Sequence, residues 1–264
     1  MFTCDYCKKD FPGFPKKCPH CRSIIDFGNV TRSDSSELLP LSSVIACYDA
    51  TVIFDTETSG LNFATDRIIE LSYILIDRNG CVIRDDDLLI RLPDGEKLPS
   101  EIVALTGITD EMLNNGVEEK EAAERFADIF KGDRFLLVAH NAQFDINYLY
   151  RMLMRNGRAE ILKNCDMLDT LTIYKDRRDY PHKLANAILA YNLQGKVKNS
   201  HRAIDDTLAL YEVMKAMDLE RNDLGSYINI FGYNPKYGVS GLKVRSVRYV
   251  PQPYNSKLKL YYKL

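Results

Sequence analysis

The chain has 264 residues, a formal net charge of −2 and 45% hydrophobic residues. That length allows one domain of ordinary size with small appendages and excludes a second large domain. The sequence has no apolar run of eighteen residues, and its N-terminus is polar and bears cysteines. We therefore expect a soluble, cytoplasmic protein with no membrane segment.

The first predicted unit, residues 1–27, contains two C-x-x-C knuckles that are ten residues apart. Paired knuckles are typical of a tetrahedral zinc site, although this gap is shorter than in the common version. We predict a zinc ribbon with one structural Zn²⁺, which would supply the folding energy of so small a unit. A disulfide pair is the alternative, and the expected intracellular location disfavours it. Whether the ribbon contacts nucleic acid, contacts protein or is purely structural is open. Its predicted ligands are Cys4, Cys7, Cys18 and Cys21.

Residues 28–43 contain several Ser residues, Asp34 and Pro40 and show no sustained periodicity, which indicates a linker. The body, residues 44–222, then opens with apolar stretches that predict antiparallel strands. An Asn-Gly pair at Asn79 and Gly80 is typical of the turn in a hairpin. The expected strands are Val44–Glu57, Arg67–Asp77, and two short ones near Cys81–Arg84 and Leu88–Leu92.

Helices and strands alternate in the second half of the body. The continuous apolar run Phe135–Ala139 predicts a buried parallel strand. The expected pattern is an α/β fold with a mixed five-stranded sheet flanked by helices and the site at strand ends. The expected helices are Ser100–Leu105, Asp110–Asn114, Lys120–Phe130, Asp145–Asn156, Lys183–Tyr191 and one from Ala203 onward, with a last strand and a helix start in Cys165–Thr172.

Three short motifs place acids where a divalent metal pair could meet them: FDTETSGL (54–61), HNAQFD (140–145) and HRAIDD (201–206). Asp55 and Glu57 follow an apolar run, and side chains two apart on a strand point to the same face. Clustered buried carboxylates are costly unless a cation neutralises them, and hard oxygen ligands suit Mg²⁺ or Mn²⁺. These motifs therefore predict a metal site.

His201 and Asp206 are five residues apart, an offset that would rotate the two side chains roughly 140° apart on one helix. We therefore expect His201 in the loop or first turn ahead of a helix that carries Asp206 near its start. An imidazole beside fixed carboxylates can accept a proton from a metal-bound water at neutral pH. The spacing predicts that His201 is a general base.

The order D-x-E, H-N-x-x-F-D and H-x-A-x-x-D resembles the DnaQ-like 3′–5′ exonucleases of the DEDDh type, which include the proofreading epsilon subunit of bacterial DNA polymerase III. The resemblance implies a ribonuclease-H-like fold, His201 as the base, and Asp55, Glu57, Asp145 and Asp206 as ligands of two Mg²⁺ or Mn²⁺ ions. The stretch LPSEIVALTGITDEML (98–113) resembles the family's pocket for the terminal nucleotide. The resemblance places Thr58, Leu105, Thr106, His140 and Phe144 around that nucleotide.

The resemblance implies a metal-dependent exonuclease that hydrolyses single-stranded or frayed DNA 3′ ends to nucleoside 5′-monophosphates. A DNA polymerase or another protein of DNA replication, proofreading or DNA repair is the expected protein partner. One alternative is an RNA 3′–5′ exonuclease of the same family, because both sugars present the same scissile bond. A second alternative is a catalytically silent nucleic-acid-binding module, which the complete acid set disfavours.

The last unit, residues 223–264, is a basic and aromatic appendage. It has seven Lys and Arg residues from Lys236 onward and no acid in that range, which leaves the preceding chain at −9. This composition suits stacking of bases and neutralisation of phosphates. The alternation in Val244–Val250 and Leu258–Tyr262 equally favours a small β-rich appendage whose lysines keep its edges soluble.

Overall fold

The computed structural model describes residues 2–3, 10–11, 42–197 and 202–252. Near the N-terminus, β1 (Phe2–Thr3) and β2 (Asp10–Phe11) pair antiparallel. The four cysteines of the predicted zinc ribbon, most of the predicted linker and His201 lie outside the described residues. The predictions made for them therefore stay predictions.

A five-stranded mixed sheet forms the centre of the molecule, in the order β5-β4-β3-β6-β7. Three strands are antiparallel neighbours, and β6 and β7 join β3 in parallel. The predicted mixed sheet is thereby confirmed, including the buried parallel strand that ends at Ala139. The strands are β3 (Ala50–Thr58), β4 (Ile68–Asp77), β5 (Val82–Leu89), β6 (Phe135–Ala139) and β7 (Cys165–Asp169).

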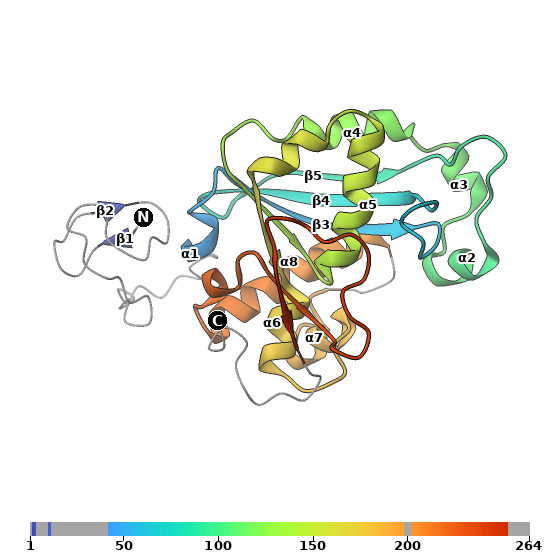
Figure 1. Cartoon of the computed structure of the whole chain (residues 1–264). Helices are drawn as coiled ribbons and strands as arrows, with labels where there is room; N and C mark the ends of the chain where they lie inside the picture. Colours follow the sequence, from blue (N-terminus) through green and yellow to red (C-terminus); the bar gives the residue numbers. More distant parts are fainter. Residues whose placement is uncertain (1, 4–9, 12–41, 198–201, 253–264) are drawn as a thin grey trace.

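Helices cover both faces of this sheet (Figure 1). On one face, α4 (Glu119–Ala127) and α5 (Ala142–Arg155) pack against Val52 and Phe54 of β3. On the other face, Ile53 packs in a second apolar cluster, because successive strand residues point to opposite faces. None of the helices in the described residues is long and apolar enough to cross a membrane. The helices of that second face are α1 (Ser42–Ile45), α6 (Thr170–Arg177), α7 (Leu184–Ala190) and α8 (Ala203–Glu220).

Two short helices, α2 (Ser100–Thr106) and α3 (Asp110–Asn114), follow the sheet's antiparallel half. Both were predicted almost to the residue. Gly107 ends α2 with a φ of 71°, and the Thr109 hydroxyl accepts a hydrogen bond from the Met112 amide at the start of α3. These residues are typical helix signals, since glycine adopts a positive φ without steric cost and threonine caps helix N-termini.

Several of the expected boundaries are wrong. The helix expected at Lys120–Phe130 ends at Ala127, and the strand expected at Val244–Val250 begins at Arg248. The first strand begins at Ala50 because α1 and a turn occupy the residues before it. Residues 82–89 form one continuous strand where we expected a break. Asp85, Asp86 and Asp87 pair with β4 there as an edge strand, and the Tyr73 hydroxyl donates to Asp86. Helix α5 begins at Ala142, three residues ahead of the expected Asp145.

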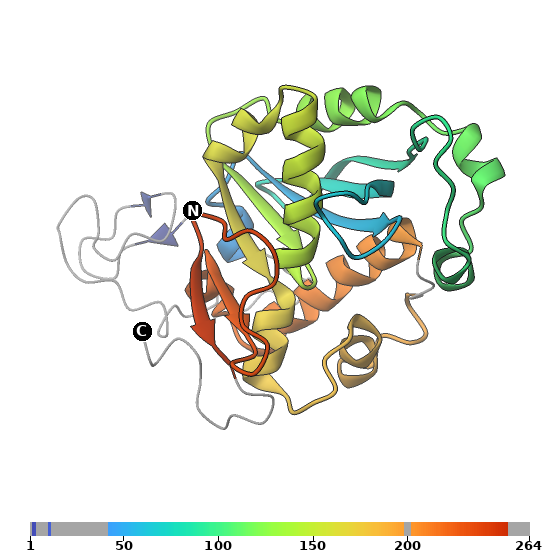
Figure 2. The ribbon, with the colours of Figure 1, turned by 45° about the vertical axis from the view of Figure 1, so that its right-hand side comes forward.

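The residues after α8 pack on the body. η3 (Leu224–Tyr227) leads to a parallel pair formed by β8 (Ile230–Tyr233) and β9 (Arg248–Pro251), the red strands beside β7 and α6 in Figure 2. Asn229 fixes this unit to β7, because it exchanges two hydrogen bonds with the Met167 backbone at 2.8 and 2.9 Å. Tyr227 and Phe231 are fully buried. Those two aromatic residues therefore belong to the core. The second strand expected in this unit, Leu258–Tyr262, lies outside the described residues.

Candidate metal centre and active site

Three acidic side chains converge at the end of β3. Asp55 and Glu57 leave the strand on the face that α8 covers, and Asp206 lies in the first turn of α8. One carboxylate oxygen of each lies within 4.8 Å of the other two. The alternation of β3 explains this arrangement, because Ile53, Asp55 and Glu57 share one face. The donor set consists of carboxylate oxygens alone, which fits Mg²⁺ or Mn²⁺ better than zinc.

Asp145 approaches the same strand from the opposite side. It lies in the first turn of α5 and is 3% exposed. Its Oδ1 accepts hydrogen bonds from the Thr56 amide at 3.2 Å and from the Thr56 hydroxyl at 2.7 Å. The negative charge of Asp145 still acts on Asp55 and helps to raise the pKa of the Asp55 carboxyl group. The four acids thus surround the end of β3, three at one point and Asp145 beside them.

The cluster is electrostatically unfavourable without a cation. Burial raises the pKa of Asp55 well above its ordinary value, and the charges of Asp145, Asp206 and Glu57 raise it further. Burial, followed by the charge of Asp206, raises the pKa of Glu57 to about 8. Burial also raises the pKa of Asp145 to about 7, against the opposing effect of its hydrogen bonds from Thr56. A divalent cation would relieve this repulsion and would favour the charged carboxylates.

A further carboxylate, Glu70, was missed by the sequence motifs. It lies on β4 directly opposite Glu57 and is fully buried. Its two oxygens accept hydrogen bonds from the Arg202 guanidinium and, at 2.7 Å, from the Ala203 amide. Glu70 therefore holds the first residue of α8, the helix that carries Asp206. Arg202 stands next to His201 in the third motif, but nothing in the spacing links it to Glu70.

The turn before α5 is fixed by Asp169, a second residue that the sequence did not single out. Its Oδ1 accepts from the amides of Asn141 and Ala142 at 2.9 and 3.1 Å. Asn141 adopts the left-handed conformation, with a φ of 74°, which asparagine tolerates better than most residues. These hydrogen bonds fix the turn from β6 into α5 and therefore the direction in which the Asp145 side chain points.

A family model described as Exonuclease matches residues 52–214 of the chain. The chain belongs to this exonuclease family. The matched range contains all of the candidate carboxylates and extends from β3 into α8.

Curated relatives of this chain are named as DNA polymerase III proteins. It is 34% identical over 198 residues to the PolC-type DNA polymerase III of Ureaplasma parvum, an alignment that covers 74% of this chain and 13% of that protein. It is 32% identical over 168 residues to the DNA polymerase III subunit epsilon of Treponema pallidum, covering 62% of this chain and 74% of that protein. The chain spans only 10–13% of the length of the first three PolC-type proteins it matches.

Solved structures show the same fold. Exonuclease I of E. coli, in complex with a dA16 oligonucleotide, matches with a TM-score of 0.61 and 19% identity, over 68% of this chain and 42% of that chain. The likeness confirms the exonuclease-type sheet and helices that the motifs implied.

The polar residues predicted to surround a terminal nucleotide make hydrogen bonds within the protein. The Thr58 hydroxyl donates to the Gly60 carbonyl at 2.7 Å, and the Thr106 hydroxyl donates to the Ile102 carbonyl at 2.9 Å. The ring nitrogens of His140 lie 3.0 Å from the Thr170 hydroxyl and 3.0 Å from the His182 carbonyl. Burial lowers the pKa of His140, so its neutral form is favoured.

The two apolar residues of the predicted nucleotide pocket retain accessible surface. Leu105, at the end of α2, is 53% exposed, and Phe144, in the first turn of α5, is half-buried. The Phe144 ring packs against the Tyr148 ring at a centroid distance of 4.9 Å. A role for these five residues in binding a nucleotide stays a prediction, and the half-buried Phe144 and exposed Leu105 are the ones with apolar surface to offer.

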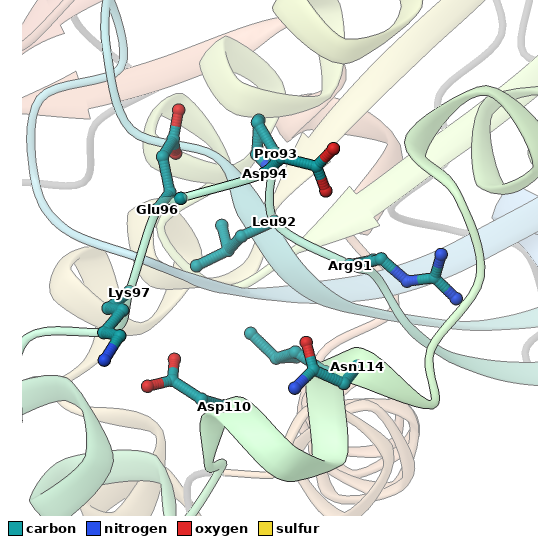
Figure 3. A pocket seen from close by; sticks show the side chains of 10 residues that line it. Arg91, Leu92, Pro93, Asp94, Glu96, Lys97, Asp110 and Asn114 are labelled. Atoms are coloured by element: carbon teal, nitrogen blue, oxygen red, sulfur yellow. The ribbon is translucent and has the colours of Figure 1, made fainter.

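A small cavity of about 200 Å³ lies away from the carboxylate cluster, between the loop Arg91–Lys97 and α3 (Figure 3). Its wall mixes acids and bases, among them Asp94, Lys97 and Asp110. It contains none of the predicted site residues, and its mixed charge favours no single class of ligand.

Proposed function

We propose that the chain is a metal-dependent 3′–5′ exonuclease that hydrolyses single-stranded or frayed DNA 3′ ends to nucleoside 5′-monophosphates. The convergence of Asp55, Glu57 and Asp206 within 4.8 Å is the observation that carries the proposal. Family membership supports it, because the match includes every acid of the site. A catalytically silent module would have no need to keep this costly cluster of charges.

The candidate site residues have different proposed roles. Asp55, Glu57, Asp145 and Asp206 would hold two Mg²⁺ or Mn²⁺ ions, for which their oxygen donors and raised pKa values are suited. When bound, such ions stabilise the attacking and leaving oxygens of a phosphodiester displacement. His201 is the proposed base that accepts the proton of the attacking water. Leu105 and Phe144 would offer apolar surface to the terminal nucleotide.

DNA is the favoured substrate because the curated relatives are named as DNA polymerase III proteins. For the same reason a DNA polymerase, or another replication or repair protein, is the proposed partner. An RNA 3′–5′ exonuclease remains the second candidate, since no contact to a 2′-hydroxyl can be assigned from the site residues.

The proposal is tested with purified protein and 5′-labelled DNA and RNA oligonucleotides in Mg²⁺, in Mn²⁺ or in chelator. Stepwise shortening of DNA that requires metal supports it. Preferential shortening of RNA would identify RNA, and not DNA, as the substrate. Intact binding without shortening in any metal would refute the exonuclease assignment. The Asp55→Asn variant serves as the matched inactive control, because it removes one metal ligand without changing size.

We further propose that residues 1–27 form a zinc ribbon on Cys4, Cys7, Cys18 and Cys21, joined by a linker at 28–43 to an exonuclease domain at 44–222. Zinc measured at one equivalent per chain, and lost in a Cys4→Ser, Cys7→Ser variant, would support the ribbon. A chain that lacks residues 1–43 should still shorten oligonucleotides. Complete loss of turnover would mean that the ribbon is part of the active body.

A further inference from the structure

The chain after Asp223 contains no acidic residue. The described part of this segment carries four exposed cations, Lys236, Lys243, Arg245 and Arg248. None of the four forms an ion pair with another residue in 42–197 or 202–252. The rest of the chain is acidic, so these charges are concentrated on one part of an otherwise negative protein. We call residues 234–247, between β8 and β9, the C-terminal loop.

The C-terminal loop is fastened to the first turns of α5. The Gln143 side-chain amide donates to the carbonyls of Ser240 and Leu242, both at 2.7 Å. The Leu242 amide donates to Asn147 Oδ1 at 2.8 Å. The Tyr249 hydroxyl donates to Gln143 Oε1 and accepts from the Val244 amide. Four of these hydrogen bonds reach Gln143 or Asn147 of α5, so the backbone that carries Lys243 and Arg245 is held at a defined place.

Gly241 makes this close approach feasible. Its φ is 74°, and an added Cβ would lie 3.0 Å from the amide group of Asn147. A side chain at this position would strain the backbone and push the loop away from α5. The sequence thus supplies glycine at the one point where the loop backbone crosses the Asn147 side chain.

The C-terminal loop closes one side of a cavity of about 930 Å³. The floor is apolar and comes from α5 and η2 (Ala159–Asn164), including Ile146 and Leu162. Lys163, Lys243 and Arg245 line it, against the single acid Glu160. Tyr150, which is 37% exposed, adds an aromatic surface from the same helix. Cations beside an accessible aromatic ring are the combination by which proteins bind single-stranded nucleic acid.

The cavity and the candidate metal centre share α5. Ile146 follows Asp145 directly, while Gln143 and Asn147 are each two residues from Asp145 and so point to the other side of the helix. A helix with its side chains is about 10–12 Å across. Phosphates repeat about every 3.4 Å along one strand of stacked, B-form DNA. A strand whose 3′ end reaches Asp145 would therefore pass around the start of α5 and reach the cavity after about three to five nucleotides.

We propose that this cavity binds the single-stranded nucleic acid upstream of the nucleotide being removed, with Lys163, Lys243 and Arg245 on its phosphates and Tyr150 against a base. This inference rests on the proposed exonuclease function and adds to it a second contact region outside the metal centre. The occupant is a polyanion because cations outnumber acids in the lining. The consequence is a dependence of substrate affinity on strand length.

The test compares a Lys243→Gln, Arg245→Gln variant with a Lys120→Gln, Lys131→Gln control. Both remove two exposed positive charges, but Lys120 and Lys131 do not line the cavity. The substrates are a 5′-labelled thymidine dinucleotide and a thymidine 20-mer. We expect the first variant to raise KM for the 20-mer about 10-fold at unchanged kcat, and to cleave the dinucleotide like the parent protein. The control variant should match the parent on both substrates.

Binding of the 20-mer in chelator, followed by fluorescence anisotropy over a range of salt concentrations, gives an independent readout. Each lost phosphate contact reduces the slope of log K against log salt by about 0.7 for a single strand, so the double variant should lower it by about 1.4. An unchanged slope and an unchanged KM would overturn the proposal and leave an acidic protein segment as the class of occupant. If the parent protein cleaves neither substrate, the exonuclease function fails, and the salt slope still tests the cavity.

Discussion

Glu70 and Arg202 form an ion pair beside the candidate metal centre, with the Arg202 Nε 2.8 Å from a Glu70 oxygen. The other Glu70 oxygen accepts from the Ala203 amide, so one carboxylate holds both the side chain before α8 and the first amide of the helix. Glu70 itself lies opposite Glu57 in the sheet. The pair therefore fixes α8 relative to β3, and with it the distance from Asp206 to Asp55.

Replacing Glu70 should impair turnover more than binding. In Glu70→Gln, one acceptor oxygen becomes an amide donor that faces Arg202 or the Ala203 amide. The start of α8 should shift, and a misplacement of about 1 Å can cost about 10²-fold in rate. We expect kcat to fall by about that factor while KM for an oligonucleotide changes little, as measured by steady-state kinetics.

Glu119→Gln is the matched control for Glu70→Gln. Glu119 is a partly buried acid that, like Glu70, accepts hydrogen bonds from arginine side chains, here Arg67 and Arg155, but it belongs to α4 and not to the carboxylate cluster. Both variants should lower the melting temperature. Equal losses of kcat in the two would show that Glu70 acts through general stability instead of through α8.

Asp206 and Asp205 are neighbours in the first turn of α8, but of the two only Asp206 belongs to the carboxylate cluster. Asp206→Asn removes an oxygen of the metal cluster and should reduce turnover by about 10³ or more, which corresponds to roughly 4 kcal/mol of lost transition-state stabilisation. Asp205→Asn removes the same charge from the neighbouring position, which is outside the cluster. Its rate should stay within a few-fold of the parent. Comparable losses would contradict metal binding by Asp206.

The stability of the metal-free protein should fall as pH rises. Folded-state pKa values of about 8 for Glu57 and about 7 for Asp145 exceed the ordinary values near 4. Between about pH 4 and pH 8 the folded protein binds more protons than the unfolded chain, so the free energy of unfolding decreases as pH rises. A loss of 1 kcal/mol lowers the melting temperature by about 2–4 °C. We expect a decrease of about 5 °C or more from pH 5 to pH 8.5 in chelator.

Adding Mg²⁺ or Mn²⁺ should restore more stability at pH 8.5 than at pH 5, because metal binding requires the deprotonated acids. Asp55→Asn should melt higher than the parent protein in chelator at pH 8.5, since it removes a charge from the cluster. Scanning calorimetry of both proteins measures this. A melting temperature of the metal-free parent that rises with pH would contradict the raised pKa values.

His201 lies outside the described residues, and its role is open to kinetic test. If it is the base, His201→Ala should slow turnover by about 10²–10⁴ at neutral pH. The deficit should shrink at high pH, where hydroxide replaces the protonated water. A rate close to that of the parent protein would remove His201 from this role.

The elements that depend on local sequence were predictable. The apolar run of β6, the Asn-Gly turn after β4 and the glycine that ends α2 each specify their conformation within a few residues. Asp55 and Glu57 were predictable for the same reason, since they share a face of one strand. The break expected within β5 was wrong because an edge strand tolerates three acids in a row, of which Asp85 and Asp87 are exposed and Asp86 is half-buried.

Long-range contacts were not predictable from spacing. Glu70 and Asp169 were missed, although both fix residues of the recognised motifs, because their partners lie far away in the chain. The position of Asp145 is a similar case. Its hydrogen bonds with Thr56 depend on how α5 crosses the sheet, which no local pattern specifies.

The order in which the carboxylates occur along the chain has a consequence for synthesis. A chain emerging from the ribosome completes all five strands of the central sheet before α8, and therefore before Asp206, exists. A nascent chain holds Asp55 and Glu57 without their third partner. If the cluster is catalytic, hydrolysis begins only when translation of this domain is nearly finished, so an incomplete domain has no nuclease activity.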